Sequence, residues 1–139
     1  MVETLMERID KILNHDLFLY HLGRNNAAEA DRRFCRHGMV HFLDVARIGT
    51  IIALEEGLKI DREWIYAAAL LHDCGKHEQY ENGIPHEQAS ARIAPEILKA
   101  CGFNDEETGV IVTAISRHRD PAAAKEKNLN GILYRADKA

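Results

Sequence analysis

Apolar residues recur at intervals of three and four positions along most of the chain, and alternating β-branched runs of the kind found in strands are missing. Such spacing is typical of helices that bury one face. The pattern therefore predicts an all-α fold, a compact single-domain helical bundle of about six to seven helices spanning residues 1–139. We expect residues 1–35 to form N-terminal helices and residues 36–139 to form the core that carries the chemistry.

Polar and special residues mark where several of these helices begin and end. Gly57 is placed as a C-cap glycine, and Asp61 is a good N-cap for the helix that follows. Pro85 is placed like a proline at the first helical position, and Asn104 with Glu107 forms a capping-box pattern. The expected helices cover about 2–14, 16–33 with a candidate break near Gly23, 39–56, 61–73, 85–102, 104–120 and 130–139, and residues 74–85 are expected to be a polar connection.

The composition fits a globular domain and argues against a nucleic-acid partner. The chain has 139 residues, 46% of them hydrophobic and 29% charged, and a net charge of −4. This charge disfavours broad electrostatic binding to a nucleic-acid polymer or to an anionic membrane. A small anionic substrate stays open, because its binding depends on local charge.

Export and membrane insertion are not predicted. The segment Met1–Arg8 is acidic and lacks the apolar core of a signal peptide, and the apolar run Trp64–Leu71 is too short to span a bilayer. The three cysteines have no CxxC spacing, which favours a reducing compartment. We expect a cytoplasmic protein, and the oligomeric state is open.

Histidine is the unusual feature of the composition, with eight copies. Four of them, on four predicted helices, fall on apolar faces: His41, His72, His86 and His118. A lone histidine at such a position is usually a hydrogen-bonded core residue, but four would each need a buried partner. A shared metal ion satisfies all of them together, whereas His15, His21, His37 and His77 lack the inward spacing and are left out of the metal site.

Two aspartates complete the candidate donor set. Asp73 directly follows His72, and Asp137 lies one turn after the apolar pair Leu133 and Tyr134. A set of imidazoles and carboxylates without thiolate favours Fe, Mn, Co, Ni or Zn. His86 falls in a first helical turn, where the positive end of the helix dipole favours the neutral imidazole that a metal needs. Asp137 stands two residues from the end of the sequence, so fraying of its helix is expected unless it is packed or metal-bound.

The order of these residues resembles the H…HD…D pattern of the HD-domain superfamily. His41 lies in Val-His-Phe-Leu-Asp, His72-Asp73 follows Ala-Leu-Leu, and Asp137 ends Arg-Ala-Asp. Members are in the main all-helical metal-dependent phosphohydrolases, and the resemblance covers about residues 36–139. The stretch His72–Lys76 also looks like the HDxGK form of some cyclic-dinucleotide phosphodiesterases, but the GYP element of that subfamily is not seen.

The resemblance implies a ligand set and two divalent metal ions per chain. The first ion takes His41, His72, Asp73 and Asp137, and His86 and His118 match the extra histidines of dinuclear members, in which the aspartate bridges both ions. The alternative is that one or both of these histidines bind substrate phosphate or only pack. Two such ions would activate a water molecule for attack on phosphorus.

The expected activity is hydrolysis of a phosphate ester or anhydride of a small nucleotide-like substrate, with Asp73 and Lys76 as catalytic candidates. If the helix continues past Asp73, Lys76 lies one turn after His72, where its ammonium stabilises developing negative charge. Further phosphate-binding candidates are Arg36, Arg117 and Arg119, each of which could equally be a solvated surface arginine. Two alternatives stay open: a mixed-valent diiron oxygenase of the same superfamily, and a non-catalytic ligand-binding module.

Overall fold

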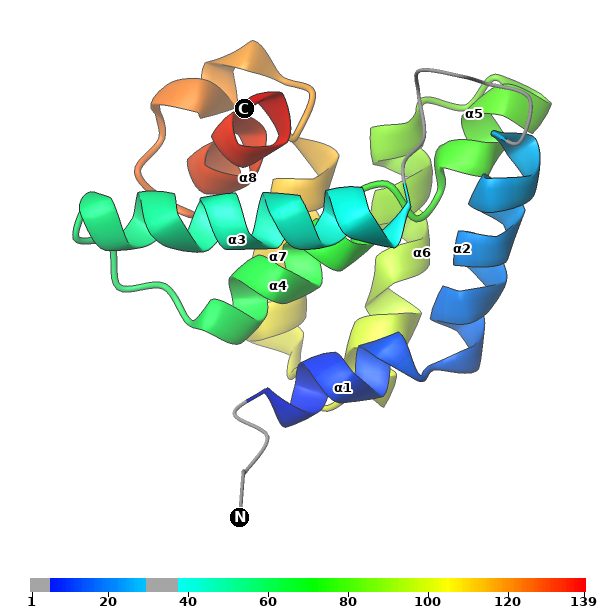
Figure 1. The fold of residues 1–139 in the computed structure, drawn as a ribbon, viewed down its shortest axis with the longest axis horizontal. Coiled ribbons are helices and arrows are strands. Elements are labelled where there is room, and N and C mark those ends of the chain that lie inside the picture. The colour runs from blue at the N-terminus through cyan, green and yellow to red at the C-terminus, as the bar shows by residue number, and fades with distance from the viewer. Residues whose placement is uncertain (1–5, 30–37) are drawn as a thin grey trace.

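The computed structural model describes residues 6–29 and 38–139, and these residues form helices and loops without a β-strand. The all-α prediction is confirmed (Figure 1). Within these two stretches no helix combines the length and the apolar character needed to cross a membrane. The helices are α1 (Glu7–Leu13), α2 (Asp16–Ala28), α3 (Met39–Glu55), α4 (Arg62–Leu71), α5 (Lys76–Asn82), α6 (His86–Ala100), α7 (Asp105–Ser116), a 3-10 helix (Pro121–Lys125) and α8 (Leu129–Lys138).

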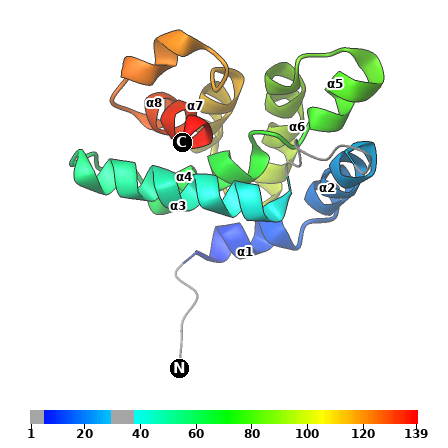
Figure 2. The same ribbon diagram turned by 45° about the horizontal axis from the view of Figure 1, so that its top comes forward.

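The helix α4 is the centre of the packing, and its small side chains allow neighbours to approach closely. Residues 67–71, three alanines and two leucines, are all 0% exposed. α4 packs against α1, α3, α6, α7 and α8, and α3 runs across it in the view of Figure 1. Figure 2 shows α7 and α8 together at one end and α2, α5 and α6 at the other. The C-terminal end of α4 is therefore placed where most of the other helices meet.

The predicted helix ends agree with the local hydrogen bonding. Asp61 caps α4 by accepting a hydrogen bond from the Glu63 backbone N–H at 2.8 Å. Asn104 and Glu107 form the full capping box of α7. Gly57 has a φ of +67°, the left-handed conformation that a C-terminal glycine adopts readily. Pro85 is the N-cap residue of α6, one position before the expected one.

Two local predictions are wrong. Residues 74–85 are not a simple connection, because they contain α5, a helix of 7 residues. α4 ends at Leu71, and the chain turns through residues 72–75 before α5 begins. The helix α2 continues past Gly23 without a break as far as Ala28, and the remainder of the predicted range 16–33 lies largely outside the described residues.

The glycine of this turn is required by a close crossing. A Cβ atom on Gly75 would lie 2.7 Å from the Cβ of Ala89 and 2.7 Å from the backbone nitrogen of Ser90, both in α6. Real Cβ atoms do not approach backbone so closely, so another residue would push α6 away. The turn after α4 and the helix α6 can therefore pack together because residue 75 has no side chain.

The N-terminal helix α1 is attached to the rest of the molecule by Arg8. Its guanidinium donates to Glu63 of α4 at 2.7 Å and to Glu107 of α7 at 2.9 Å. The same group lies 4.1 Å from the centre of the Phe103 ring, a favourable cation–π position. α1 is thus fixed to α4 and α7 by an ion-pair network as well as by its buried residues Ile9 and Ile12.

Two glycines give a matched test of how closely α8 packs against the residues that precede it. A Cβ on Gly131, in the first turn of α8, would lie 1.8 Å from the carbonyl oxygen of Glu126, whereas a Cβ on Gly109 in α7 meets no atom within 4 Å. Gly131→Ala is expected to lower the free energy of unfolding by about 1–3 kcal/mol or more. Gly109→Ala should raise it by up to about 1 kcal/mol, because alanine favours a helix. Urea-induced unfolding measures both free energies. A Gly131→Ala variant as stable as wild type would contradict the close approach of α8 to the Glu126 carbonyl.

Candidate metal centre

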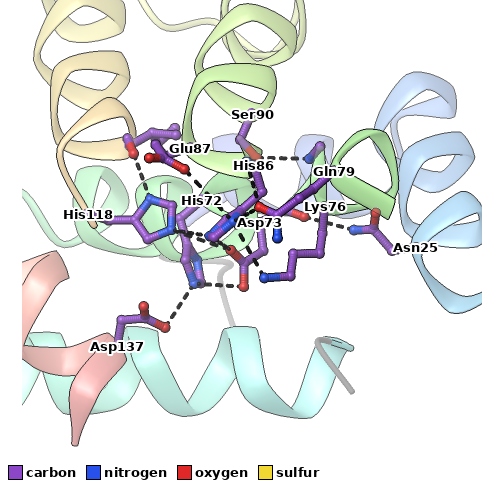
Figure 3. Close-up of polar contacts among 12 residues, drawn as sticks. Asn25, His72, Asp73, Lys76, Gln79, His86, Glu87, Ser90, His118 and Asp137 are labelled. Atoms are coloured by element: carbon purple, nitrogen blue, oxygen red, sulfur yellow. Dashed lines mark hydrogen bonds and ion pairs between the residues drawn. The ribbon is translucent and has the colours of Figure 1, made fainter. Parts of the chain in front are cut away.

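The six predicted metal ligands come together from five different places in the fold. His41 lies at the start of α3, the pair His72-Asp73 follows α4, and His86 opens α6. Two further residues come from the C-terminal third of the chain, where His118 follows α7 and Asp137 lies in the last turn of α8. Figure 3 shows His72, His86 and His118 around the carboxylate of Asp73, with Asp137 beside His72.

Four of these residues form a first group whose ligand atoms lie within 4.8 Å of one another: His41, His72, Asp73 and Asp137. His72 Nε2 lies 3.2 Å from Asp137 Oδ1 and 3.4 Å from Asp73 Oδ2. His41 Nε2 lies 3.2 Å from Asp137 Oδ1 and 4.0 Å from Asp73 Oδ2. Two imidazoles and two carboxylates therefore face a common point.

Asp73 also belongs to a second group, with His86 and His118. Its other oxygen, Oδ1, lies 3.3 Å from His86 Nε2 and 3.5 Å from His118 Nε2. The two imidazole nitrogens are 3.1 Å apart, and all three residues are buried. One carboxylate therefore faces both groups, with a different oxygen toward each.

Backbone carbonyls fix the orientation of two of the imidazoles. Nδ1 of His72 lies 2.6 Å from the carbonyl oxygen of Ala69, and Nδ1 of His118 lies 2.6 Å from that of Ile115. A carbonyl oxygen only accepts, so Nδ1 carries the proton in both rings. Nε2, which faces the carboxylates, is therefore the nitrogen left to bind a cation.

The orientation of His86 is fixed by Gln79 of α5. The side-chain oxygen Oε1 of Gln79 accepts from the His86 backbone N–H at 3.0 Å and lies 2.7 Å from His86 Nδ1. Because this oxygen accepts in both contacts, Nδ1 of His86 is a donor and Nε2 bears the lone pair. Outer hydrogen bonds of this kind are typical of metal-binding histidines.

The converging lone pairs fit a metal ion. With Nδ1 protonated, the neutral rings of His86 and His118 direct two Nε2 lone pairs at each other and at Asp73 Oδ1, an arrangement that a cation between them stabilises. In the first group the oxygens of Asp73 and Asp137 surround His72 Nε2, a negatively charged setting that also favours a cation. The donors are nitrogen and oxygen without sulfur, as first-row divalent transition metals accept.

The pKa values reflect the same crowding of charge. Burial lowers the pKa of His72, but the carboxylates of Asp73 and Asp137 outweigh it and raise that pKa to about 9. Burial, together with the nearby groups Lys76, His118 and Arg119, lowers the pKa of His86 to about 3, although the carboxylate of Asp73 opposes this shift. Burial opposes ionisation of Asp73 and Asp137, yet the neighbouring histidines hold the pKa of both carboxyls below the usual range. His86 is thus neutral near pH 7, ready to bind a metal.

Lys76 lies beside the metal centre, but on a different helix from the predicted one. α4 does not continue past Asp73, and Lys76 is instead the first residue of α5. Its Nζ still lies 3.4 Å from His86 Nδ1 (Figure 3). Because both atoms are donors, this contact is no hydrogen bond, and the ammonium remains available to an anion beside the second group.

The three candidate arginines differ in their surroundings. Arg117 forms ion pairs with Asp120, at 3.3 Å, and with Glu126. Arg119 is exposed, and its charge contributes to lowering the pKa of His86. Arg36 lies outside the described residues. A phosphate-binding role of these arginines stays a prediction.

One histidine excluded by spacing is in fact buried. His77 is 4% exposed, and its Nε2 lies 2.8 Å from Nδ1 of His21 in α2, with the rings stacked. Sequence spacing did not predict this burial, because the helix α5 was not expected. Of the others, His15 caps α2 by accepting from the Leu17 N–H, and His37 lies outside the described residues. Neither His77, His21 nor His15 belongs to the two groups of potential ligands found among the described residues.

The last ligand candidate is held by packing. Asp137 follows Ala136, and Ile132, Leu133 and Ala136 of α8 are buried. α8 packs against α3, α4 and α7. This contact supports the terminal turn, so Asp137 is placed beside His41 and His72 despite its position near the end of the sequence.

A match to the model of a known protein family covers most of the chain. The model of the HD-domain family matches residues 38–139. The chain belongs to the HD-domain family. The family match begins just before α3, so α1 and α2 lie outside it.

Two relatives of this HD-domain protein extend the comparison. An uncharacterised protein of Clostridium beijerinckii is 49% identical over 133 residues, which cover 96% of this chain and 83% of the relative. A crystal structure from an uncultured Thermotogales bacterium, described as a predicted HD superfamily hydrolase, is similar with a TM-score of 0.66 and 28% identity. The similarity covers 86% of this chain and 66% of that chain. The two proteins therefore share the same fold over most of this chain.

The raised pKa of His72 predicts that metal affinity depends on pH. With a pKa of about 9, His72 carries a proton at pH 7 in the metal-free protein, and a metal must displace it. Affinity should therefore rise by up to about tenfold per pH unit from pH 7 to 9 and then level off. Competition with a chelator across this range measures the effect. Calorimetry in two buffers of different ionisation enthalpy should count about one released proton at pH 7, and a flat profile would contradict the assignment.

Proposed function

We propose that this HD-domain protein is a metal-dependent phosphohydrolase that acts on a phosphate ester or anhydride of a small nucleotide-like substrate. The observation that carries the proposal is the shared carboxylate of Asp73, with one oxygen toward each group of imidazoles. Two adjacent cation sites of this kind suit a reaction in which a phosphoryl group must be held while water attacks it. The Thermotogales neighbour, described as a hydrolase, supports this class of reaction.

In this proposal each chain holds two divalent ions drawn from Fe, Mn, Co, Ni or Zn. The first would be held by His41, His72, Asp73 and Asp137, and the second by Asp73, His86 and His118. Bound ions of this kind supply Lewis acidity, which lowers the pKa of water and neutralises phosphate charge.

The protein itself contributes orientation and one positive charge. Carbonyls and Gln79 hold the rings with Nε2 inward, so little reorganisation is needed when a ligand arrives. Lys76 places its ammonium 3.4 Å from the His86 ring, where it would stabilise negative charge that develops on phosphoryl oxygens. Arg119, exposed near His86, is a further candidate for binding phosphate.

The proposed partner is a small anionic molecule and not a nucleic-acid polymer or a membrane. The net charge of −4 argues against broad electrostatic binding of either, so the attraction for phosphate would be local, at Lys76 and Arg119. A cytoplasmic location and a single domain over residues 1–139 belong to the same proposal.

Metal content tests the assignment of ligands. Asp73→Ala should abolish metal binding, because both groups lose a ligand. His86→Ala and His118→Ala should each lose mainly the second ion and retain the first. His15→Ala is the matched control, since that ring only caps α2. Elemental analysis of each purified variant gives ions per chain; equal content in wild type and all variants would overturn the assignment.

Activity tests the reaction class separately. Phosphate release from a panel of nucleotides, with Mn or Co added, should identify a substrate. On that substrate Lys76→Met should lower kcat by roughly 10²-fold while metal content is unchanged, because an electrostatic contact to the transition state is lost. Silence on the whole panel, together with an iron spectrum that responds to oxygen, would favour the diiron oxygenase alternative instead.

A further inference from the structure

A residue outside the family match forms a hydrogen bond with the backbone of Asp73, the residue shared by the two groups of potential ligands. Asn25 lies in α2, among the residues that precede the match to residues 38–139, and it is 0% exposed. Its Nδ2 donates to the carbonyl oxygen of Asp73 at 2.8 Å. Its Oδ1 accepts from the backbone N–H of His77, also at 2.8 Å. One buried amide thus spans the turn that follows the His72-Asp73 pair (Figure 3).

The second of these bonds replaces a missing helix cap. The N-cap position of α5 is Gly75, which has no side chain to offer and makes no side-chain cap bond. Gly75 cannot be exchanged for a capping residue, because a Cβ there would lie 2.7 Å from Ser90 N. The N–H of His77 is the group that an N-cap side chain would normally satisfy. Asn25 satisfies it from another helix.

The first bond fixes the backbone of Asp73 itself. The Asp73 carbonyl also accepts from the Lys76 N–H at 3.0 Å, so it is held from within the turn and from α2. On the other side of the turn, Ser90 Oγ of α6 accepts from the Gly75 N–H at 2.9 Å. The turn is therefore clamped between α2 and α6, and the direction of the Asp73 side chain follows from this clamp.

Other polar contacts join α2 to α5 without touching this turn. His21 contacts the His77 ring, and Arg24 forms an ion pair with Glu81. These contacts hold the two helices side by side, but they act on side chains of α5. They provide a comparison that separates the packing of α2 from the placement of Asp73.

We propose that Asn25 is a positioning residue of the metal centre, and that α2 is consequently part of the functional unit. Asn25 binds no metal. It holds the Asp73 backbone so that the two carboxylate oxygens face the two groups of imidazoles. This inference rests on the proposed metal binding, and its test uses metal affinity and not catalytic activity.

The test compares three variants in the full-length protein. Asn25→Ala removes both hydrogen bonds. Asn25→Asp keeps the volume and the acceptor for the His77 N–H, but it places an oxygen against the Asp73 carbonyl. Arg24→Met is the matched control, because it breaks the ion pair between α2 and α5 and leaves the turn untouched. Cobalt affinity is measured by competition with a chelator, and the visible absorption of the cobalt-loaded protein is recorded at saturation.

Both Asn25 variants should weaken cobalt binding about 10–100-fold and change the visible spectrum, as loss of an outer hydrogen bond to a ligand does. Arg24→Met should stay within about twofold of wild type. Thermal unfolding in chelator identifies variants that lose only fold stability, and Asn25→Asp keeps the test valid if Asn25→Ala does not fold. Wild-type affinity and spectrum in Asn25→Asp would overturn the role of Asn25 alone, whereas wild-type protein that binds no cobalt would overturn the metal centre as well.

Discussion

The carboxylate of Asp73 lies between two sets of imidazoles, with Oδ2 toward His72 and Oδ1 toward His86. A buried carboxylate is stable only beside positive or hydrogen-bonding partners. Five helices or helix ends must therefore meet at one point to supply them. The small residues of α4 make that meeting possible, since they let neighbouring helices approach the end of the helix from which Asp73 projects.

Two of the imidazoles are oriented by backbone carbonyls three residues earlier in the chain. His72 bonds to Ala69, and His118 bonds to Ile115, each in the last turn of a helix. Carbonyls in a last turn lack a complete set of intrahelical partners, so they are free to accept from a side chain. A histidine just beyond a helix C-terminus is thus directed by its own helix, and this local device is used twice in the same site.

Much of this arrangement can be predicted from the sequence, because it depends on local pattern. Periodicity places His41 and His118 on inward faces, and the caps at Asp61 and Asn104 are local motifs. α5 could not be predicted, because it is a short polar helix whose cap comes from Asn25, 52 residues away from His77. Non-local hydrogen bonds have no signature in the sequence around them.

Gly75 bears on how the sequence His72–Lys76 should be interpreted. The space for any side chain at this position is already taken by Ala89 and Ser90 of α6. The fold thus demands glycine here whatever molecule the protein acts on. A glycine shared with the HDxGK form consequently reflects the close packing of a turn against a helix, and it is no evidence for a particular substrate.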